Sequence, residues 1–233
     1  MTPADKSTRP KPGLAAWAGL ALTLGVSGWV VWESQRLIRA DLGSMAARQD
    51  VALWAGGAEA PASQAAWQAA LQDIERAVDI IPDNAAFHAA RGDAHMVAGT
   101  QEWFGPEQRQ KQFMQAIESY KTSLRLRPTE PQTWASLASA YFGAGELGAP
   151  LHQAWDRALK LGPHEGHVQP VLMDLALATW STATPEMRAW VEATFENTSE
   201  AGRDEINRMA ALRGLKLTST TPATAGTATE PKP

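Results

Sequence analysis

Three segments decide the fold: ALQDIERAVDIIP (70–82), AIESYKTSLRLRP (116–128) and LHQAWDRALKLGP (151–163). In each one, a small or apolar residue is followed after four positions by a bulky one, then by a small residue and a proline. These positions are Ala70, Ile74, Ala77 and Pro82; Ala116, Tyr120, Ser123 and Pro128; and Leu151, Trp155, Ala158 and Pro163. Spacings of three and four put the first three positions on one face of a helix, which the proline then ends. The pattern predicts three similar, closely packed helices.

The segment PQTWASLASAYFGAGE (131–146) lies between the second and third copies. Together with them it resembles the tetratricopeptide repeat (TPR), whose first helix reads W-x2-L-G-x2-Y-x3-G and whose second reads A-x3-F-x2-A-x4-P. The matching first-helix positions are Trp134, Leu137, Ala138, Tyr141 and Gly145. NAAFHAARGDAHMVAG (84–99) is a poorer copy of the same helix. The resemblance covers residues 63–163 and implies a stack of α-hairpins that holds partner proteins.

Candidate partner-binding residues follow from that resemblance, because the peptide groove of the family is lined by first helices. The candidates on this face are Gln132, Ala135, Ser139, Phe142, Asp93 and Met96. They lack the Lys, Arg and Asn set of family members that clamp a carboxylate. The interval between the first two copies also contains an insertion, TQEWFGPEQRQK (100–111), with Trp103 and Phe104. These two aromatics either pack on the helices, rest at a membrane surface, or anchor a partner.

The stretch GLAAWAGLALTLGVSGWVVW (13–32) contains no charged residue. A helix of this length spans roughly 30 Å at about 1.5 Å per residue, close to the thickness of a bilayer core. Trp17 near one end and Trp29 and Trp32 near the other suit the headgroup regions. We therefore predict one uncleaved transmembrane helix. A cleaved signal peptide is the alternative, but no Ala-x-Ala site follows the run.

The orientation of that helix rests on basic residues, which are equal in number on its two sides. Those involved are Lys6, Arg9 and Lys11 before the run, and Arg36, Arg39 and Arg48 after it. The short N-terminal tail favours a cytoplasmic N-terminus. We therefore predict a single-pass protein of a bacterial inner membrane with a periplasmic C-terminal domain.

The predicted fold class is all-α, with an N-terminal transmembrane helix followed by a TPR-like α-hairpin stack and C-terminal capping helices. The predicted boundaries are a short basic tail at 1–12, the transmembrane helix at 13–32, and a juxtamembrane helix and turn at 33–62. The TPR-like repeats follow at 63–163 and a C-terminal helical extension at 164–215. The polar, low-complexity segment 216–233 is predicted to be a disordered tail.

Several chemical functions find no support in the sequence. There is no cysteine, and the net charge of −4 disfavours nucleic acid as a partner. No G-x-S-x-G elbow or phosphate-binding loop is present, and the histidines of PHEGH (163–167) lack the zincin spacing. His88 and His95 are read as structural. We therefore expect no catalytic, cofactor or metal site, and no enzymatic activity.

The predicted function is that of a scaffold for protein–protein interactions in a bacterial envelope complex. The layout of anchor, few repeats and helical extension resembles the VpsP-like accessory proteins of exopolysaccharide biosynthesis, which implies contact with a polymerase or export complex. A cytochrome c maturation chaperone is the first alternative, since membrane-anchored repeat proteins there hold apocytochrome peptides. A helical sugar-processing enzyme subunit is the second, and it would need paired carboxylates in a deep groove.

Overall fold

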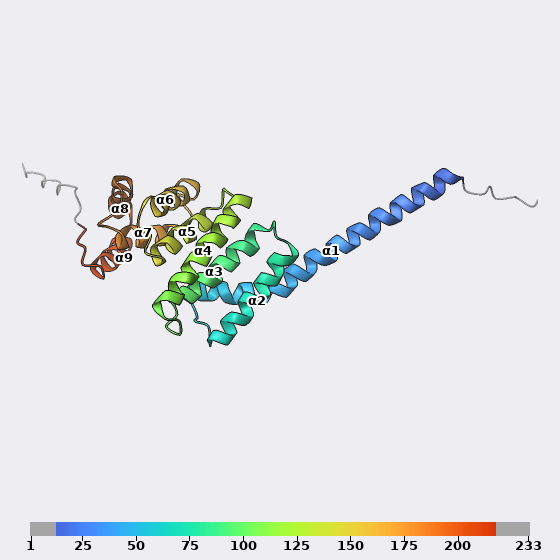
Figure 1. Ribbon diagram of the computed structural model, residues 1–233. Helices are drawn as coiled ribbons and strands as arrows, with labels where there is room; N and C mark the ends of the chain where they lie inside the picture. The colour runs from blue at the N-terminus through green and yellow to red at the C-terminus, as the bar shows by residue number, and fades with distance from the viewer. Residues whose placement is uncertain (1–12, 218–233) are drawn as a thin grey trace, which may run out of the picture.

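The computed structural model describes residues 13–217, and every regular element in that range is an α-helix (Figure 1). The helices are α1 (Leu14–Ala55), α2 (Gln64–Ile80), α3 (Ala85–Thr100), α4 (Pro106–Leu126), α5 (Pro131–Gly143), α6 (Ala149–Leu161), α7 (Gln169–Ala178), α8 (Pro185–Asn197) and α9 (Glu200–Ala211). The prediction of an all-α chain is confirmed for these residues. The predicted basic tail at 1–12 and residues 218–233 of the predicted disordered tail lie outside the described range.

Consecutive helices pack in pairs, and the first helices of successive pairs also touch one another. The pairs are α1 with α2, α3 with α4, and α5 with α6, while α1 contacts α3, α3 contacts α5, and α5 contacts α7. Only the C-terminal part of α1 takes part, through buried residues such as Ala40, Ala47 and Val51. The helices α1, α3, α5 and α7 therefore lie in a row along one side of the stack (Figure 1).

The residues of the repeated pattern form the interior of this stack. Tyr120 and Trp155, which occupy the bulky position, are almost fully buried, and the small residues Ala116 and Ala158 are completely so. The helices α2, α4 and α6 each end two residues before the proline of their segment. Gly145 adopts a φ of +78° in the turn after α5, a backbone conformation that favours glycine.

The predicted insertion at 100–111 is not a separate segment. Residues up to Thr100 belong to α3 and residues from Pro106 onward belong to α4, so most of the insertion lengthens these helices. The Phe104 ring meets the Trp67 ring edge-on, with centroids 5.5 Å apart. Trp103 packs in the same cluster. Of the interpretations left open for these two aromatics, packing on the helices is the one that the structure shows.

The C-terminal helices continue the stack by specific contacts. Trp155 of α6 donates a hydrogen bond of 2.9 Å from Nε1 to the carbonyl oxygen of Leu172 in α7. The side chains of Thr184 and Ser199 cap the N-termini of α8 and α9. These contacts place α7 as the next helix in the row of first helices.

Among the described residues, no helix contains a stretch that is both long and apolar enough to cross a membrane. The prediction of a transmembrane helix at 13–32 is therefore wrong. The membrane-anchored, single-pass inner-membrane location with a periplasmic domain fails with it, because it was derived from that helix. The prediction rested on the absence of charge over this run, and absence of charge alone does not establish a membrane-spanning helix. Glycine, threonine, serine and tryptophan make up nearly half of the run, whereas insertion is favoured by Leu, Ile, Phe and Val.

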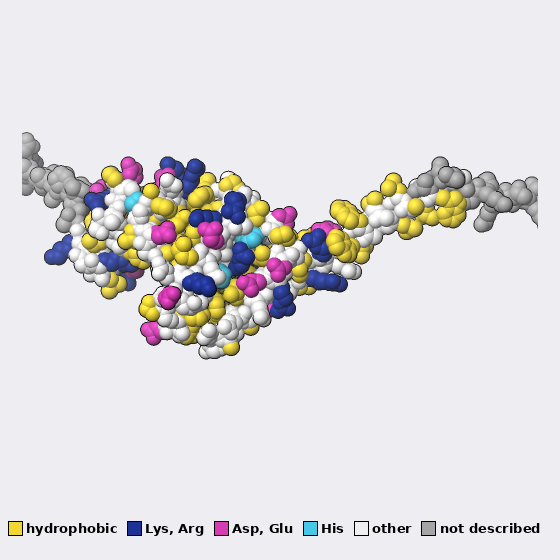
Figure 2. All heavy atoms as spheres, in the orientation of Figure 1, with side chains coloured by type: hydrophobic (Ala, Val, Ile, Leu, Met, Phe, Trp, Pro, Cys, Tyr) yellow, Lys and Arg dark blue, Asp and Glu magenta, His cyan; other side chains and the backbone are white. Residues whose placement is uncertain are grey.

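Residues 14–32 instead form the first part of α1, which extends from the helical body (Figure 1). The same helix runs without a break to Ala55, so the predicted juxtamembrane segment at 33–62 is mostly α1 itself. Apolar side chains are exposed along its first part, and mixed charges cover the helical body (Figure 2). Its C-terminal part is the first helix of a hairpin.

Candidate functional site

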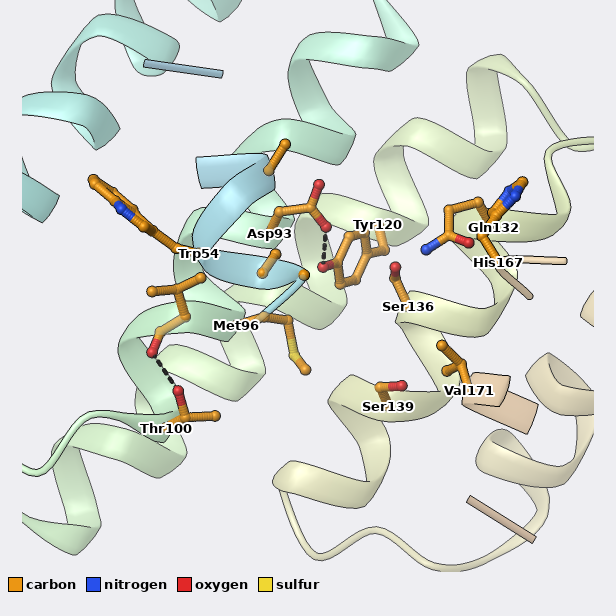
Figure 3. A pocket seen from close by; sticks show the side chains of 14 residues that line it. Trp54, Asp93, Met96, Thr100, Tyr120, Gln132, Ser136, Ser139, His167 and Val171 are labelled. Atoms are coloured by element: carbon orange, nitrogen blue, oxygen red, sulfur yellow. Dashed lines mark hydrogen bonds between the residues drawn. The ribbon is translucent and has the colours of Figure 1, made fainter. Parts of the chain in front are cut away.

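The row of first helices encloses a pocket of about 560 Å³, which we call the first-helix pocket (Figure 3). Its walls come from the end of α1, from α3 and α5, and from the start of α7, and one residue of α4 reaches it. Ala52–Gly56 close one side, and His167 and Val171 close the opposite side. The pocket therefore spans all the helices of the row and depends on their packing.

The centre of the pocket is a pair formed by Asp93 of α3 and Tyr120 of α4. The Tyr120 hydroxyl donates a hydrogen bond of 2.7 Å to Oδ1 of Asp93. Burial raises the pKa of Asp93 to about 6, and the hydrogen bond from Tyr120 acts in the opposite direction. Burial, followed by the negative charge of Asp93, raises the pKa of Tyr120 well above its usual value. Tyr120 is therefore a neutral donor, and Asp93 is a half-buried carboxyl group that titrates near neutrality.

Gly92 allows Tyr120 to reach this position. A Cβ atom at Gly92 would lie 2.5 Å from Cε1 of the Tyr120 ring, which is much closer than van der Waals contact. The Tyr120 side chain is almost fully buried and has little room to retreat. The absence of a side chain at Gly92 is therefore a condition for the bond between Tyr120 and Asp93.

The hydroxyl groups around this pair are already engaged as donors. Ser136 hydrogen-bonds to Tyr120, which lowers the pKa of that tyrosine. Ser139 donates to the carbonyl oxygen of Ala135 at 3.1 Å, and Thr100 donates to that of Val97 at 2.8 Å. What these hydroxyls still offer to the pocket is the lone pairs of their oxygens.

Gln132 adds an amide to the wall of the pocket next to the Asp93–Tyr120 pair (Figure 3). Its Oε1 atom is buried and has no hydrogen-bond partner among the described residues. A buried amide oxygen without a donor is uncommon, because leaving it unpaired costs about 1–3 kcal/mol. The amide nitrogen of Gln132 is the atom turned toward Ser136 and Tyr120 (Figure 3).

A second pocket of about 300 Å³ adjoins the first and shares Asp93 and Gln132 with it; we call it the Arg48 pocket. Its two cations have partners of their own. Arg48 pairs with Asp41 at 2.5 Å, and Arg127 pairs with Glu130 at 3.3 Å. Among the described residues, no lysine, arginine or histidine forms an ion pair with Asp93.

The structure brings together four of the eight residues predicted to bind a partner. Those that line the first-helix pocket are Gln132, Ser139, Asp93 and Met96. Ala135 is completely buried beneath the surface of α5, and Phe142 is partly exposed but does not line the pocket. Trp103 and Phe104 belong to the packed cluster described above.

Sequence reasoning missed several residues of the pocket, of which Tyr120 is the most important. It was assigned a purely structural role because it occupies the bulky position of a second helix. Gly92 was the available signal, because a glycine in a packed helix leaves room for a large side chain from the neighbouring helix. Trp54 was missed because the end of α1 was placed in a juxtamembrane segment, although it faces the pocket.

The buried histidines His88 and His95 bond to neighbouring groups of the protein. Within residues 13–217, no group of three or more His, Asp or Glu side chains is placed to hold a metal ion. His88 contacts the carbonyl oxygen of Pro82 through Nε2 at 2.7 Å, and His95 contacts Oε1 of Gln112 through Nδ1 at 2.7 Å. Both histidines therefore contribute to packing between helices.

Comparison with known proteins does not assign the chain to a family: no family model matches it, and no curated protein is significantly similar to it. Function is therefore inferred from the first-helix pocket itself. That pocket offers one titratable carboxyl group, several hydrogen-bond acceptors and apolar walls.

Proposed function

We propose that this chain is a non-catalytic scaffold of the TPR kind, and that it holds a segment of a partner protein in the first-helix pocket. The observation that carries the proposal is the position of the pocket. It lies along a row of first helices drawn from successive hairpins, and side chains from each of them line it. A surface built in this way is long, concave and made of exposed helix faces, which suits an extended or helical peptide.

The assignment to the TPR kind is supported by where the repeated pattern falls in the fold. The bulky residues Tyr120 and Trp155 fill the space between helices, and Ala116 and Ala158 lie where helices approach closely. Each second helix ends shortly before its proline. These are the structural roles that the repeat pattern requires of its residues.

The size of the site supports a peptide as the ligand. A volume of about 560 Å³ lies within the range of roughly 300–1,000 Å³ that is usual for ligand sites. The Arg48 pocket extends the surface along α3, so a bound segment can continue beyond the first-helix pocket. The walls contain both apolar groups, such as Met96 and Val171, and polar ones, such as Ser139.

Binding explains the arrangement of titratable groups better than catalysis does. The helical sugar-processing enzyme considered above would need two carboxylates on either side of a bond. Among the described residues that line the first-helix pocket, Asp93 is the single carboxylate, and its partner is the neutral hydroxyl of Tyr120. A lone carboxyl group paired with a tyrosine is suited to holding a ligand.

Site-specific photo-crosslinking in cells tests this proposal. A photoreactive amino acid at Ser139 lies in the pocket, whereas one at the exposed Glu192 lies on α8 and is the matched control. We expect a discrete crosslinked protein from position 139 that is absent from position 192 and is lost when Met96→Arg fills the pocket. Identical crosslinking from both positions, or none from position 139, would refute the assignment of the pocket as a binding site.

A further inference from the structure

We propose that the first-helix pocket selects a partner segment carrying an arginine side chain, whose guanidinium group is seated on Asp93. This inference rests on the proposed function, because it names the chemistry of the segment that the scaffold holds. The occupant is a segment of another protein. The central observation is a carboxylate in a partly apolar pocket that the chain itself leaves without a counter-charge.

The carboxyl group of Asp93 has one open oxygen and no cationic partner among the described residues. Tyr120 donates to Oδ1, and within the described residues no donor is bonded to Oδ2. The nearby cations of the Arg48 pocket, Arg48 and Arg127, are engaged with Asp41 and Glu130. A half-buried carboxylate without a cation is costly for the free protein, and a cationic ligand would offset that cost.

The hydroxyl groups of the pocket wall face a ligand as hydrogen-bond acceptors. Because the hydroxyl hydrogens of Tyr120 and Ser139 are already donated within the protein, their oxygens face a ligand as acceptors. Together with Oδ2 of Asp93, these groups form a site that is rich in acceptors.

A pocket that is rich in acceptors favours a side chain with many hydrogen-bond donors. A guanidinium group carries five N–H donors, no acceptor and a full positive charge, so it can satisfy several acceptors at once. An ammonium group has only three donors, and its removal from water costs more free energy. An amide group brings an acceptor oxygen, which would face the acceptors of the wall. Arginine is therefore the preferred side chain, followed by lysine, and glutamine and glutamate are disfavoured.

The apolar walls accept the rest of the same side chain. Trp54, Met96 and Val171 line the pocket around the polar groups (Figure 3). The methylene stem of an arginine packs on such surfaces. A segment in which apolar residues flank the arginine would therefore fit the pocket best.

Affinity selection with peptide pools tests the inference. The full chain is immobilised and exposed to four pools of acetylated pentapeptide amides, with randomised flanks and Arg, Lys, Gln or Glu fixed at the centre. Mass spectrometry then measures the retained fraction of each pool. We expect the Arg pool to be retained about tenfold more strongly than the Gln pool, a ratio typical of one charge-assisted pair. The Lys pool should fall between them.

Two variants connect this preference to the carboxylate. Asp93→Asn keeps the size of the side chain and an oxygen that accepts from Tyr120, but it removes the charge. It should abolish the preference, so that the Arg and Gln pools are retained equally. Asp79→Asn, at an exposed position of α2, removes the same charge outside the pocket and should change nothing.

The outcomes separate this inference from the proposed function. Equal retention of the Arg and Gln pools would overturn the arginine preference and leave peptide binding intact. Retention of no pool would overturn both. Tighter retention of the Arg pool after deletion of residues 1–12, which contain Lys6, Arg9 and Lys11, would identify the N-terminus of a second copy of this chain as the occupant and overturn a different partner protein in that role.

Discussion

The hydroxyl group of Tyr120 donates a 2.7 Å hydrogen bond to Oδ1 of Asp93, and this bond joins a second helix to the first-helix face. It ties α4 to α3 within one hairpin and fixes the direction of the carboxyl group. The other carboxylate oxygen remains available to a ligand. A residue that fills the interior of the helical stack thus also lines the first-helix pocket.

Replacing Asp93 with asparagine should stabilise the free protein at neutral pH. Burial raises the pKa of Asp93 from 3.8 to about 6, so the folded protein holds this proton more tightly than the unfolded chain does. Ionised Asp93 therefore lowers stability above pH 6, and this loss disappears as the pH falls through 6 towards 3.8. Because Asp93 is partly exposed, we expect Asp93→Asn to gain roughly 1–2 kcal/mol at neutral pH.

Urea denaturation of the wild type and Asp93→Asn at pH 7 and pH 4.5 measures this difference. The gain should shrink at the lower pH, where Asp93 is largely protonated in the folded protein. A variant that is less stable than the wild type at pH 7 would show that the charge contributes favourably to the fold, contrary to this prediction.

Adding a methyl group at Gly92 should disturb both stability and the pocket. The new Cβ would lie 2.5 Å from the Tyr120 ring, which must then move away from Asp93. We expect Gly92→Ala to cost about 1–3 kcal/mol, the usual range for overpacking, and to weaken retention of the Arg pool. Thermal denaturation together with the pool assay measures the two effects.

Gly43→Ala is the matched control for that substitution. Gly43 is also helical, but it lies in α1 with open space around its Cα atom. Alanine there should stabilise the helix by about 0.5–1 kcal/mol and leave peptide retention unchanged. If Gly92→Ala behaved like Gly43→Ala, the close contact between Gly92 and Tyr120 would not constrain the protein.

The buried His95 should make the protein less stable in mild acid. Burial lowers the pKa of His95, the hydrogen bond that its ring donates to Oε1 of Gln112 raises it, and the charge of Arg91 lowers it further, with a net decrease. The unfolded chain therefore takes up this proton more readily, and stability falls as the pH drops below 6.5. Replacing His95 with glutamine should reduce this fall.

Asp93 titrates with the opposite sign in the same pH range, so the effect of His95 is best measured without it. Comparing Asp93→Asn with Asp93→Asn/His95→Gln between pH 7 and pH 5.5 isolates the histidine. Parallel stability curves for the two proteins would mean that the protonation of His95 is not coupled to folding.

Truncating Phe104 should affect stability and not binding. Its ring packs edge-on against Trp67, and both lie in a cluster with Val97 and Ala98. We expect Phe104→Ala to cost about 1–3 kcal/mol, because the site is partly buried, and to leave retention of the Arg pool unchanged. Chemical denaturation and the pool assay decide this. Lost retention in a variant that is still folded would return Phe104 to the set of binding residues.

Much of the helical architecture can be predicted from local signals. The spacing of Ala116 and Tyr120 predicts a buried helix face, and Pro128 predicts where that helix stops. Ser63 and Thr184 precede α2 and α8 and cap them. Such signals act over a few residues of chain, so they can be read without knowledge of the tertiary structure.

The role of α1 could not be predicted in this way. A charge-free stretch at 13–32 suggested a transmembrane helix, but absence of charge alone does not establish a membrane-spanning helix. That interpretation also drew attention away from the remainder of the helix. Its C-terminal part packs on α2 and α3 and supplies Trp54 to the pocket, which requires contacts between residues distant in sequence.

Sequence patterns predicted most of the helices between Gln64 and Ala211, where several of them end, and which faces of the repeated helices are buried. The tertiary structure alone decided which residues form the pocket. Asp93 and Tyr120 are far apart in the chain and meet because Gly92 leaves space for the ring. Helix periodicity is a local property of the chain. Whether a carboxylate has a counter-charge depends on all the residues that the fold brings near it.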